Sequence, residues 1–506
     1  MKRILSILLS ISIFITLCSC KTDLSNGNKP KKTVLPDYDS FEDKNVMMIS
    51  SFGAPEPRDD EFQKYVDCNF TAMYLTQYNS YSHLLNTKED YSYDKSKKVN
   101  KYNYATQLEL DEDYLKLGKK FGINILPSCN SHLPGDISAE KRAVYDKYSS
   151  YMGFLFCDEP FMKHIGNLTK RAEVFNSVSP DKLFYVNLNP NYGFGSVGMT
   201  GAAYWEYLDY FCTNVLDKIS GRKILSVDNY PIRTAGLNGC DYLSNFGDMR
   251  YVASKHKNTE LHMVLQSVTM NHEPGSEELY TKKLTEQDMR IQVYTSLCFG
   301  VKSLSWFTYA PMYWMGGGYG EEVAYSPILS SCIDFYNEKM PQYDWVQKVN
   351  GEVLALDNVY LNFDWKNISW LPAKDGKANS EYESVMKDMF MYDLNNDPDI
   401  EEPMLIKNIA KTKTLKSAES TGSDVLVGIF EDENKNEGFM LTAFSDYSTE
   451  APFEYENSAK VDIEFDYANK VYVINNGKKS IENVKDNKLS LDVKVGDGVF
   501  IIPINE

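Results

Sequence analysis

The sequence predicts an α/β fold in which a (β/α)8 TIM barrel is followed by a C-terminal antiparallel β-sandwich. About eight short apolar runs alternate with helical patterns over roughly 300 residues, the count and size of such a barrel. From about residue 351, alternating apolar and polar stretches take over, separated by Asn, Asp, Gly and Lys turns, as in antiparallel sandwiches. No glycine-rich phosphate loop follows a predicted strand, which favours the barrel over a doubly wound open sheet.

The run 152–160 shows most clearly how a barrel strand is recognised. It is apolar up to Asp158 and Glu159 and then meets Pro160, which cannot donate to a strand ladder and ends the strand. By the same criteria we expect strands at 46–52, 70–76, 123–127, 152–158, 183–188, 223–228, 261–266 and 302–308. The intervening patterns predict helices at 59–68, 108–121, 139–151, 166–178, 203–211, 242–256 and 286–299.

Local signals support two of these helices and the later strands. Acidic residues open helix 59–68, as the helix dipole favours, and Gly122 suits the C-terminal cap of helix 108–121. In the sandwich the pattern predicts a hairpin turn at 475–478 and strands at 425–430, 438–444, 471–474 and 498–502. The expected domain organisation is a signal peptide (1–20), a linker (21–44), the barrel (45–350) and the sandwich (351–506).

The N-terminus has the pattern of a secretory signal. Lys2 and Arg3 precede the apolar stretch 4–17, and residues 17–20 resemble a bacterial lipobox in which Cys20 becomes the lipidated first residue. The alternatives are an uncleaved membrane anchor or cleavage without lipidation. The polar linker that follows favours the lipoprotein, and no later stretch is long and apolar enough to span a bilayer. We therefore expect a chain tethered by lipid at the extracellular or periplasmic face of a bacterial cell membrane.

Composition narrows the choice of partners. A net charge of −18 makes nucleic acid and anionic membrane surfaces poor partners, so a neutral ligand is favoured. Seven scattered cysteines follow Cys20 without a C-x-x-C pair, and the six histidines form no H-E-x-x-H cluster. We therefore expect no disulfide framework, no metal site and no cofactor, with the cysteines as buried apolar residues. The oligomeric state is left open.

Amides, carboxylates and aromatic residues follow the predicted strands. Because the carboxyl ends of parallel strands meet at one edge of a barrel, these side chains should converge. Basic residues and histidine are nearly absent there, although anionic ligands and catalytic metals need them. Neutral polyols instead bind amides, acids and flat aromatic faces, so the pattern predicts a carbohydrate site. Its expected members are Gln77, Asn130, Asp158, Glu159, Asn189, Asp228, Asn229, Tyr230, Gln266, Trp306 and Tyr309.

These motifs carry a resemblance to known enzymes. The run 158–160 resembles the Asn-Glu-Pro motif of retaining (β/α)8 glycoside hydrolases, which implies that Glu159 is the general acid/base. The stretches 290–294 and 300–309 are similar to the last barrel helix and strand of β-galactosidase-like bacterial hydrolases, and 496–501 also looks like that group. The resemblance covers most of the chain after the signal, although each motif is short. It implies hydrolysis of O-glycosidic bonds.

One departure concerns the second carboxylate. The resembled enzymes place a nucleophilic glutamate at the end of strand seven, where this chain has Gln266. Asp228 is the favoured replacement, Glu273 is another, and a site without a second carboxylate is the third possibility. Glu159 would then protonate the leaving oxygen while Asp228 attacks the anomeric carbon or activates water. Asp158 should face away from Glu159 because neighbours on a strand alternate, yet its charge would help to keep Glu159 protonated.

Two other functions fit parts of the sequence. Gln266 would suit a non-catalytic, cell-surface glycan-binding lipoprotein with a degenerate barrel, and a structural envelope lipoprotein is a weaker alternative. The loop 309–319, with Trp314, is predicted to be a sugar-stacking lid, or alternatively a flexible surface loop. Trp205 and Trp345 are expected to pack in the core. The sequence leaves open the sugar, the linkage, the exo or endo mode and the stereochemical outcome.

Overall fold

The computed structural model describes fifteen stretches of the chain. They are residues 33, 35, 46–75, 106–128, 139–199, 201–234, 236–237, 239–271, 279–311, 314–315, 324–325, 328–334, 337–375, 412–444 and 458–505. The predicted signal, and nearly all of the predicted linker, lie outside them. None of the described helices is both long enough and apolar enough to cross a membrane.

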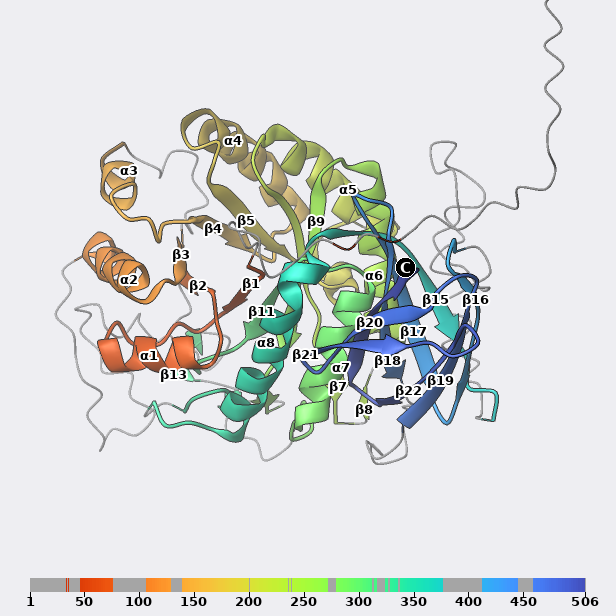
Figure 1. Cartoon of the computed structure of the whole chain (residues 1–506). Helices are drawn as coiled ribbons and strands as arrows, with labels where there is room; N and C mark the ends of the chain where they lie inside the picture. Colours follow the sequence, from red (N-terminus) through yellow and green to blue (C-terminus); the bar gives the residue numbers. More distant parts are fainter. Residues whose placement is uncertain are drawn as a thin grey trace, which may run out of the picture.

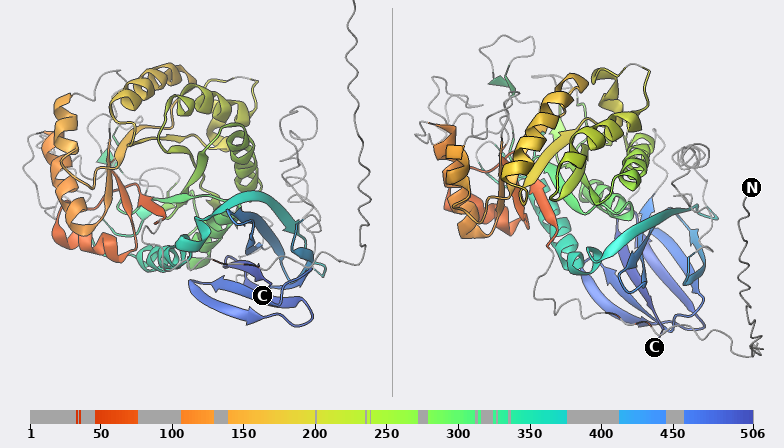
Figure 2. Two further views of the ribbon diagram at one scale, coloured as in Figure 1. Left: turned by 45° about the horizontal axis from the view of Figure 1, so that its top comes forward. Right: turned by 90° about the horizontal axis from the view of Figure 1, so that it is seen from above.

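Eight parallel strands form a barrel with helices around it, as the sequence predicts (Figures 1 and 2). The strands are β1 (Met48–Ser51), β2 (Ala72–Leu75), β3 (Asn124–Pro127), β4 (Gly153–Asp158), β5 (Leu183–Leu188), β6 (Lys223–Asp228), β9 (Thr259–Gln266) and β11 (Ser303–Phe307). Six of them pair in the order β1-β11-β9-β6-β5-β4, and β2 pairs with β3.

Two joints close the barrel. On one side, parallel bridges link Ile125 with Tyr151 and Ser128 with Leu155, which joins β3 to β4. On the other side, the backbone N–H of Thr71 donates to the carbonyl of Ile49 at 2.9 Å, which joins the start of β2 to β1. The ring therefore has no free sheet edge within the described strands, which removes a template for aggregation.

The helices lie outside the ring. They are α1 (Asp59–Asp67), α2 (Gln107–Phe121), α3 (Ala139–Tyr145), α4 (Met162–Val178), α5 (Tyr204–Asn214), α6 (Gly239–Lys255), α7 (Glu286–Cys298) and α8 (Pro341–Tyr360), with 3-10 turns η2 (Asn191–Ser196) and η3 (Leu216–Lys218). Gly122 caps α2 in the left-handed conformation, as predicted. The predicted helix 139–151 ends at Tyr145, because the backbone at Ser150 and Tyr151 pairs with β3 instead. The helix α8 extends past residue 350, and the antiparallel strands begin at Phe363.

The remaining described strands build the second region and the loops. A six-stranded antiparallel sheet has the order β15-β17-β18-β23-β20-β21, and a three-stranded sheet the order β16-β19-β22, which together form the predicted sandwich. Asn475 pairs with Lys478 across the predicted hairpin turn. The strands are β15 (Phe363–Leu371), β16 (Leu415–Thr421), β17 (Asp424–Asp432), β18 (Glu437–Phe444), β19 (Ser458–Phe465), β20 (Lys470–Asn475), β21 (Lys478–Asn483), β22 (Lys488–Lys494) and β23 (Gly498–Ile504), with loop strands β7 (Ile232–Arg233), β8 (Gly236–Leu237), β10 (Thr269–Met270), β12 (Trp314–Met315), β13 (Ala324–Tyr325) and β14 (Ile328–Ser330).

The helix α7 lies between the barrel and the sandwich. Every residue from Asp288 to Cys298 is buried, because β9 covers one side of the helix while β17 and β18 cover another. Glycine permits this close approach: a Cβ at Gly498 would lie 1.9 Å from the ring of Tyr294, and one at Gly428 would lie 2.2 Å from the carbonyl oxygen of Cys298. A helix buried on all sides requires apolar residues throughout or satisfied polar ones.

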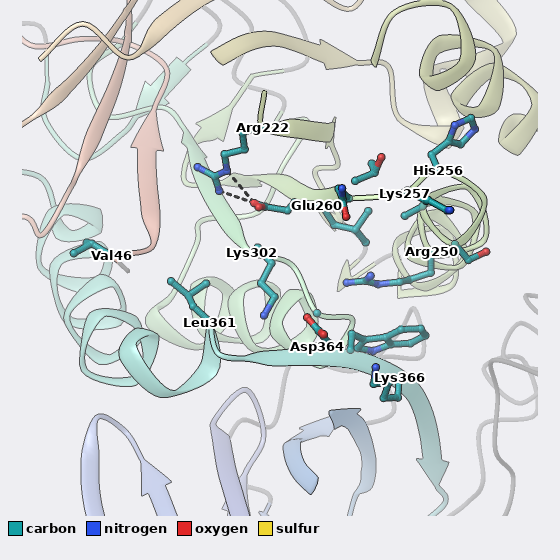
Figure 3. Close-up of a pocket in the computed structure, with 17 residues that line it drawn as sticks. Val46, Arg222, Arg250, His256, Lys257, Glu260, Lys302, Leu361, Asp364 and Lys366 are labelled. Atoms are coloured by element: carbon teal, nitrogen blue, oxygen red, sulfur yellow. Dashed lines mark hydrogen bonds and ion pairs between the residues drawn. The ribbon is translucent and has the colours of Figure 1, made fainter. Parts of the chain in front are cut away.

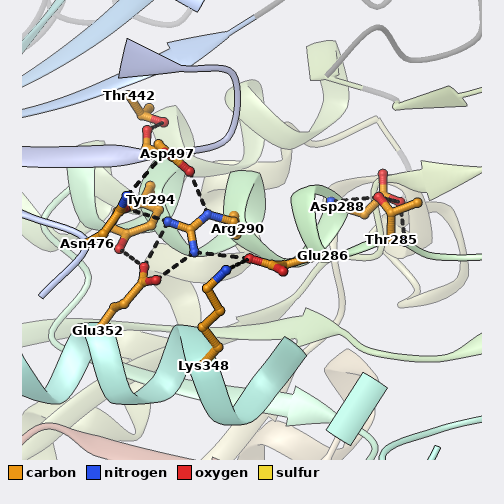
Figure 4. A network of polar contacts seen from close by, with 10 residues as sticks. All are labelled: Thr285, Glu286, Asp288, Arg290, Tyr294, Lys348, Glu352, Thr442, Asn476 and Asp497. Atoms are coloured by element: carbon orange, nitrogen blue, oxygen red, sulfur yellow. Dashed lines mark hydrogen bonds and ion pairs between the residues drawn. The ribbon is translucent and has the colours of Figure 1, made fainter. Parts of the chain in front are cut away.

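Arg290 is the polar residue that ties α7 to its neighbours (Figure 4). Its guanidinium donates to Glu352 on α8 at 2.9 Å, to Asp497 before β23 at 2.7 Å and to Asn476 in the β20–β21 turn at 2.6 Å. Tyr294 donates to the other oxygen of Glu352 at 2.7 Å. These partners come from three separate parts of the chain, so one buried cation fixes the sandwich against the barrel.

The other packing expectations agree with the structure. The five cysteines whose side chains are described are free and buried, as expected. Trp205 and Trp345 are partly buried against the hydrophobic core, as predicted.

We predict that Arg290→Met lowers the free energy of unfolding by about 3–5 kcal/mol, because it leaves the buried carboxylate of Glu352 and the partly buried carboxylate of Asp497 without their cation. Urea unfolding checks this. The control Lys348→Gln removes an exposed lysine paired with Glu286 and should cost less than about 1 kcal/mol. The double variant Arg290→Met/Glu352→Gln should recover part of the loss. Equal effects of Arg290→Met and the control would contradict this role.

Candidate active site

A cavity of about 450 Å³ opens at the carboxyl ends of the barrel strands. Three carboxyl side chains and several aromatic rings share it. Its lining consists of Phe52, Asp158, Glu159, Asn187, Tyr192, Asp228, Tyr230, Arg233, Met270, Tyr280 and Phe307. Four of the predicted site residues are therefore brought together: Asp158, Glu159, Asp228 and Tyr230.

Both acids at the end of β4, Asp158 and Glu159, reach the cavity, which corrects the expectation that only one does. A bulge in β4 shifts its register, so that Leu155 pairs with Tyr185 but Cys157 pairs with Val186 and Asp158 with Asn187. Glu159 then adopts a φ of 47°, an uncommon value for a residue other than glycine, while its N–H donates to the carbonyl of Asn187 at 2.8 Å. The strict alternation assumed from the sequence ends at this bulge and turn.

Asn187 on β5 bonds to two of the acids. Its side-chain nitrogen donates to Asp158 Oδ1 at 3.1 Å and to Asp228 Oδ1 at 2.9 Å. The two carboxylate oxygens are therefore no further apart than the sum of these distances. Asn187 Oδ1 accepts from the hydroxyl of Ser226 at 3.0 Å, so the hydroxyl of Tyr185 donates to Ser226 at 2.8 Å. This chain of donors directs the amide N–H groups towards the acids.

The pKa values of the three acids are raised. Burial raises the pKa of Asp158 to about 6 against the opposing hydrogen bond from Asn187. Burial, then the charges of Glu159 and Asp158, hold the pKa of Asp228 well above its usual value. Loss of solvation in the cavity, and then the charge of Asp158, raise the pKa of Glu159 to about 7, although water reaches this side chain at the opening.

The barrel floor beneath the acids is neutral. His262 is fully buried, with its Nδ1 2.8 Å from the hydroxyl of Ser303 and its Nε2 3.4 Å from that of Tyr74. Burial lowers its pKa to about 3, so it carries no charge near neutral pH. The rings of Tyr74 and Tyr185 stack with centroids 4.6 Å apart. The acids therefore lack a cation below them within this described floor.

Gln266 does not line the cavity, in contrast to the expectation. It is fully buried, where its Oε1 accepts from the N–H of Ile232 at 3.0 Å and its Nε2 donates to the carbonyl of Ile232 at 3.1 Å. Gln266 therefore anchors the backbone of the loop that follows β6. This loop carries Tyr230, whose N–H donates to the hydroxyl of Tyr192 at 3.2 Å.

Trp306 and Tyr309 do not line the cavity either, in contrast to the expectation that they belong to the carbohydrate site. Trp306 is fully buried outside the barrel, and its indole N–H donates to Asn350 on α8 at 2.9 Å. Tyr309 is fully buried against Tyr65, with ring centroids 4.9 Å apart. The pleat of β11 turns Phe307, not Trp306, towards the cavity.

Asn189 and Asn229 are also placed away from the cavity. Both are buried and neither contributes to the lining. Asn229 donates to Asn245 on α6 at 3.2 Å, which makes it a packing contact between a strand end and a helix. Several predicted positions lie outside the described residues: Cys20, Gln77, Asn130 and Glu273, together with most of the loop 309–319.

Sequence reasoning missed seven lining residues. Phe52, Asn187 and Phe307 were within reach, because counting in steps of two along each strand identifies the inward face. Arg233 contradicts the inference that cations are nearly absent from the cavity. The full set of missed residues is Phe52, Asn187, Tyr192, Arg233, Met270, Tyr280 and Phe307.

A larger cavity of about 900 Å³ lies at the opposite end of the barrel, next to β15 (Figure 3). Three of the cations that line it have protein partners. Arg222 bonds to Glu260 at 2.7 Å, Lys302 donates to the carbonyl of Tyr360 at 3.1 Å, and Arg250 donates to a backbone carbonyl while its guanidinium lies 4.6 Å from the ring of Trp365. The contact between Arg250 and Trp365 joins α6 to β15. The convergent acids make the other cavity the candidate active site.

Comparisons with known proteins show similarity to solved structures only. No protein-family model and no curated protein sequence matches the chain. An α-amylase from Anoxybacillus is 10% identical with a TM-score of 0.45, covering 91% of this chain and 98% of its own. A β-L-arabinopyranosidase from Geobacillus stearothermophilus is 8% identical with a TM-score of 0.42, covering 92% and 97%. An endo-β-1,4-mannanase from Thermotoga petrophila is 10% identical with a TM-score of 0.37, covering 92% and 99%.

These structural neighbours are glycoside hydrolases, but at such low identity and TM-scores the likeness carries no argument about activity. A functional conclusion for this chain must come from the chemistry of its own cavity.

We predict that Asp228→Asn stabilises the folded protein at pH 8. The pKa of Asp228 in the folded protein lies above its unfolded value near 3.8. Between these two pKa values the folded state binds more protons than the unfolded state, so the free energy of unfolding falls as pH rises through this range. Removing the charge should raise the free energy of unfolding by about 1–3 kcal/mol at pH 8 and by much less at pH 4.

Thermal unfolding of both proteins at the two pH values checks this. The exposed control Asp181→Asn should change stability by less than about 0.5 kcal/mol at either pH. A stabilisation by Asp228→Asn that is the same at pH 4 and pH 8 would contradict the assignment of a raised pKa.

Proposed function

We propose that the protein is a glycoside hydrolase that cleaves O-glycosidic bonds, with Glu159 as general acid/base and Asp228 as the second carboxylate. The observation that carries the proposal is the convergence of three carboxyl groups in one aromatic cavity at the carboxyl ends of the barrel strands. Glycoside hydrolysis requires a protonated and an ionised carboxyl group on either side of one bond. The raised pKa of Glu159 favours its protonated form.

The proposed steps follow from these positions. Glu159, at the water-accessible opening, gives its proton to the leaving oxygen as the bond from that oxygen to the anomeric carbon breaks. Asp228, buried and bonded by Asn187, either bonds to the anomeric carbon or takes a proton from the attacking water. The positive charge that develops on the sugar ring favours ionised Asp228, and the amide of Asn187 does so as well.

The rest of the cavity suits a sugar ring. Phe307 lies between Tyr230 and Phe52, with ring centroids 5.1 Å and 6.1 Å apart. Aromatic faces bind the apolar side of a sugar ring, while the acids and the amide bind its hydroxyl groups. We extend the proposal to the location: the enzyme acts outside the cytoplasm, tethered through lipid on Cys20.

The glycan-binding alternative loses its main support. It relied on Gln266 as a lost nucleophile, but Gln266 is committed to the backbone of Ile232. A pure binder has no need for three acids whose burial in one cavity raises their pKa values. Glycan binding without hydrolysis is therefore the result that would refute the hydrolase in the experiment below.

The test is hydrolysis of a panel of nitrophenyl glycosides and oligosaccharides by the chain that lacks residues 1–20. Glu159→Gln and Asp228→Asn should each lower kcat by about 10²–10⁴-fold. The control Asp181→Asn, on an exposed residue away from the cavity, should keep full activity. Oligosaccharide binding without turnover of any sugar would refute the hydrolase and leave the binding lipoprotein.

We further predict that kcat/KM falls as pH rises through about 7, because Glu159 must be protonated to act as the acid. Asp158→Asn should move this alkaline limb to lower pH, since the charge of Asp158 raises the pKa of Glu159. A pH–rate profile of both proteins measures the shift. An alkaline limb that stays in place in Asp158→Asn would show that another group is the acid.

A further inference from the structure

Arg233 occupies a fixed position in the wall of the acidic cavity. It ends β7, where its backbone pairs with Gly236 of β8. The residue before it, Ile232, is held at both its N–H and its carbonyl by Gln266. The side chain of Arg233 therefore starts from a rigid backbone, and it lines the same cavity as Asp158, Glu159 and Asp228.

Two tyrosine rings hold the guanidinium. Its central carbon lies 4.8 Å from the ring centroid of Tyr192 and 4.6 Å from that of Tyr280. The ring of Tyr192 is itself fixed, because its hydroxyl accepts from the N–H of Tyr230 at 3.2 Å. Stacking on aromatic faces stabilises the cation through its plane and leaves the N–H groups at its edge available.

The guanidinium does not pair with the acids of the cavity. Among the described residues, no carboxylate oxygen lies within 4.0 Å of an Arg233 nitrogen. Burial is the main cause that raises the pKa values of Asp158, Glu159 and Asp228, and Arg233 is not among the groups that lower them. The guanidinium of Arg233 is therefore separate from the described acids of the cavity, although an arginine side chain is long enough to reach across several ångströms.

We propose that Arg233 binds a negatively charged group on the sugar, so that the enzyme selects anionic glycans such as those bearing a carboxylate or a sulfate. This inference rests on the proposed glycoside hydrolase function and names its substrate class. The planar fork of donors in arginine matches the paired oxygens of a carboxylate or sulfate. Within the described part of the chain, a neutral sugar would leave the guanidinium with its contacts to the rings of Tyr192 and Tyr280.

The same arrangement explains how an acidic cavity accepts an anion. The raised pKa values keep part of the acid cluster protonated near neutral pH, which reduces repulsion. Arg233 then supplies the attraction at its own wall, with the substrate between it and the reacting acids. This position makes Arg233 a specificity residue, separate from the proton transfer assigned to Glu159.

The first experiment measures turnover of matched nitrophenyl glycosides: neutral hexosides, the corresponding hexuronides and their 6-sulfates. The uronide and sulfate arms distinguish the two anionic groups. Arg233→Gln should raise KM for the preferred anionic substrate about 10-fold or more, with a smaller change in kcat, while Arg233→Lys should restore part of the affinity. Arg222→Gln, which removes a cation at the opposite end of the barrel, should leave KM unchanged.

The second experiment separates this inference from the hydrolase proposal. Calorimetry measures binding of oligogalacturonate, a sulfated oligosaccharide and a neutral oligosaccharide to Glu159→Gln, which can bind without turnover. Anionic sugars should bind at least about 10-fold more tightly than the neutral one, and Arg233→Gln in that background should abolish the difference. Equal binding of all three, or a preference that survives in Glu159→Gln/Arg233→Gln, overturns the role of Arg233 whether or not hydrolysis is found.

Discussion

The described site depends on one constraint: three carboxyl groups share a single cavity and repel one another when they are ionised. Asp158, Glu159 and Asp228 share a space of about 450 Å³, and each carries a raised pKa. The amide of Asn187 opposes this repulsion by bonding to two of the acids at once. The hydroxyl groups of Ser226 and Tyr185 orient that amide from the barrel interior. In the proposed mechanism, the raised pKa values that destabilise the folded protein also allow proton transfer near neutral pH.

The surrounding fold holds this strained arrangement rigid. The barrel closes on itself through β1 and β2 on one side and β3 and β4 on the other, so the strand ends keep their spacing. The sandwich then covers α7, where buried Arg290 binds Glu352 and Asp497. Gln266 extends the support to the cavity by fixing the backbone beside Arg233. Packed elements that support a site in this way keep its charged groups in fixed positions.

The cavity combines acids for chemistry with a cation held away from them. The rings of Tyr192 and Tyr280 hold the guanidinium of Arg233 at one wall of the cavity. Without these contacts the cation could move towards the acids and neutralise them. This separation links the two proposals: raised pKa values provide a protonated Glu159, and the unneutralised guanidinium provides recognition of an anionic sugar. The overall charge of −18 pointed to a neutral ligand, but a single well-placed cation acts at short range, where net charge says little.

The sequence by itself determined the barrel, the sandwich, the order of their strands along the chain and the position of Asp158, Glu159 and Asp228 at strand ends, because apolar runs, turn residues and strand-ending proline are local signals. Only the tertiary structure decided which side chains share the cavity. The left-handed backbone at Glu159, which follows the bulge in β4, brought Asp158 and Glu159 into the same cavity, and the pleat of β11 exchanged Trp306 for Phe307. Gln266, at a strand end, bonds to the backbone of Ile232 and does not face the cavity, while Arg233 enters the cavity wall from the loop that follows β6. These outcomes depend on register and on contacts between distant residues, which local patterns do not encode.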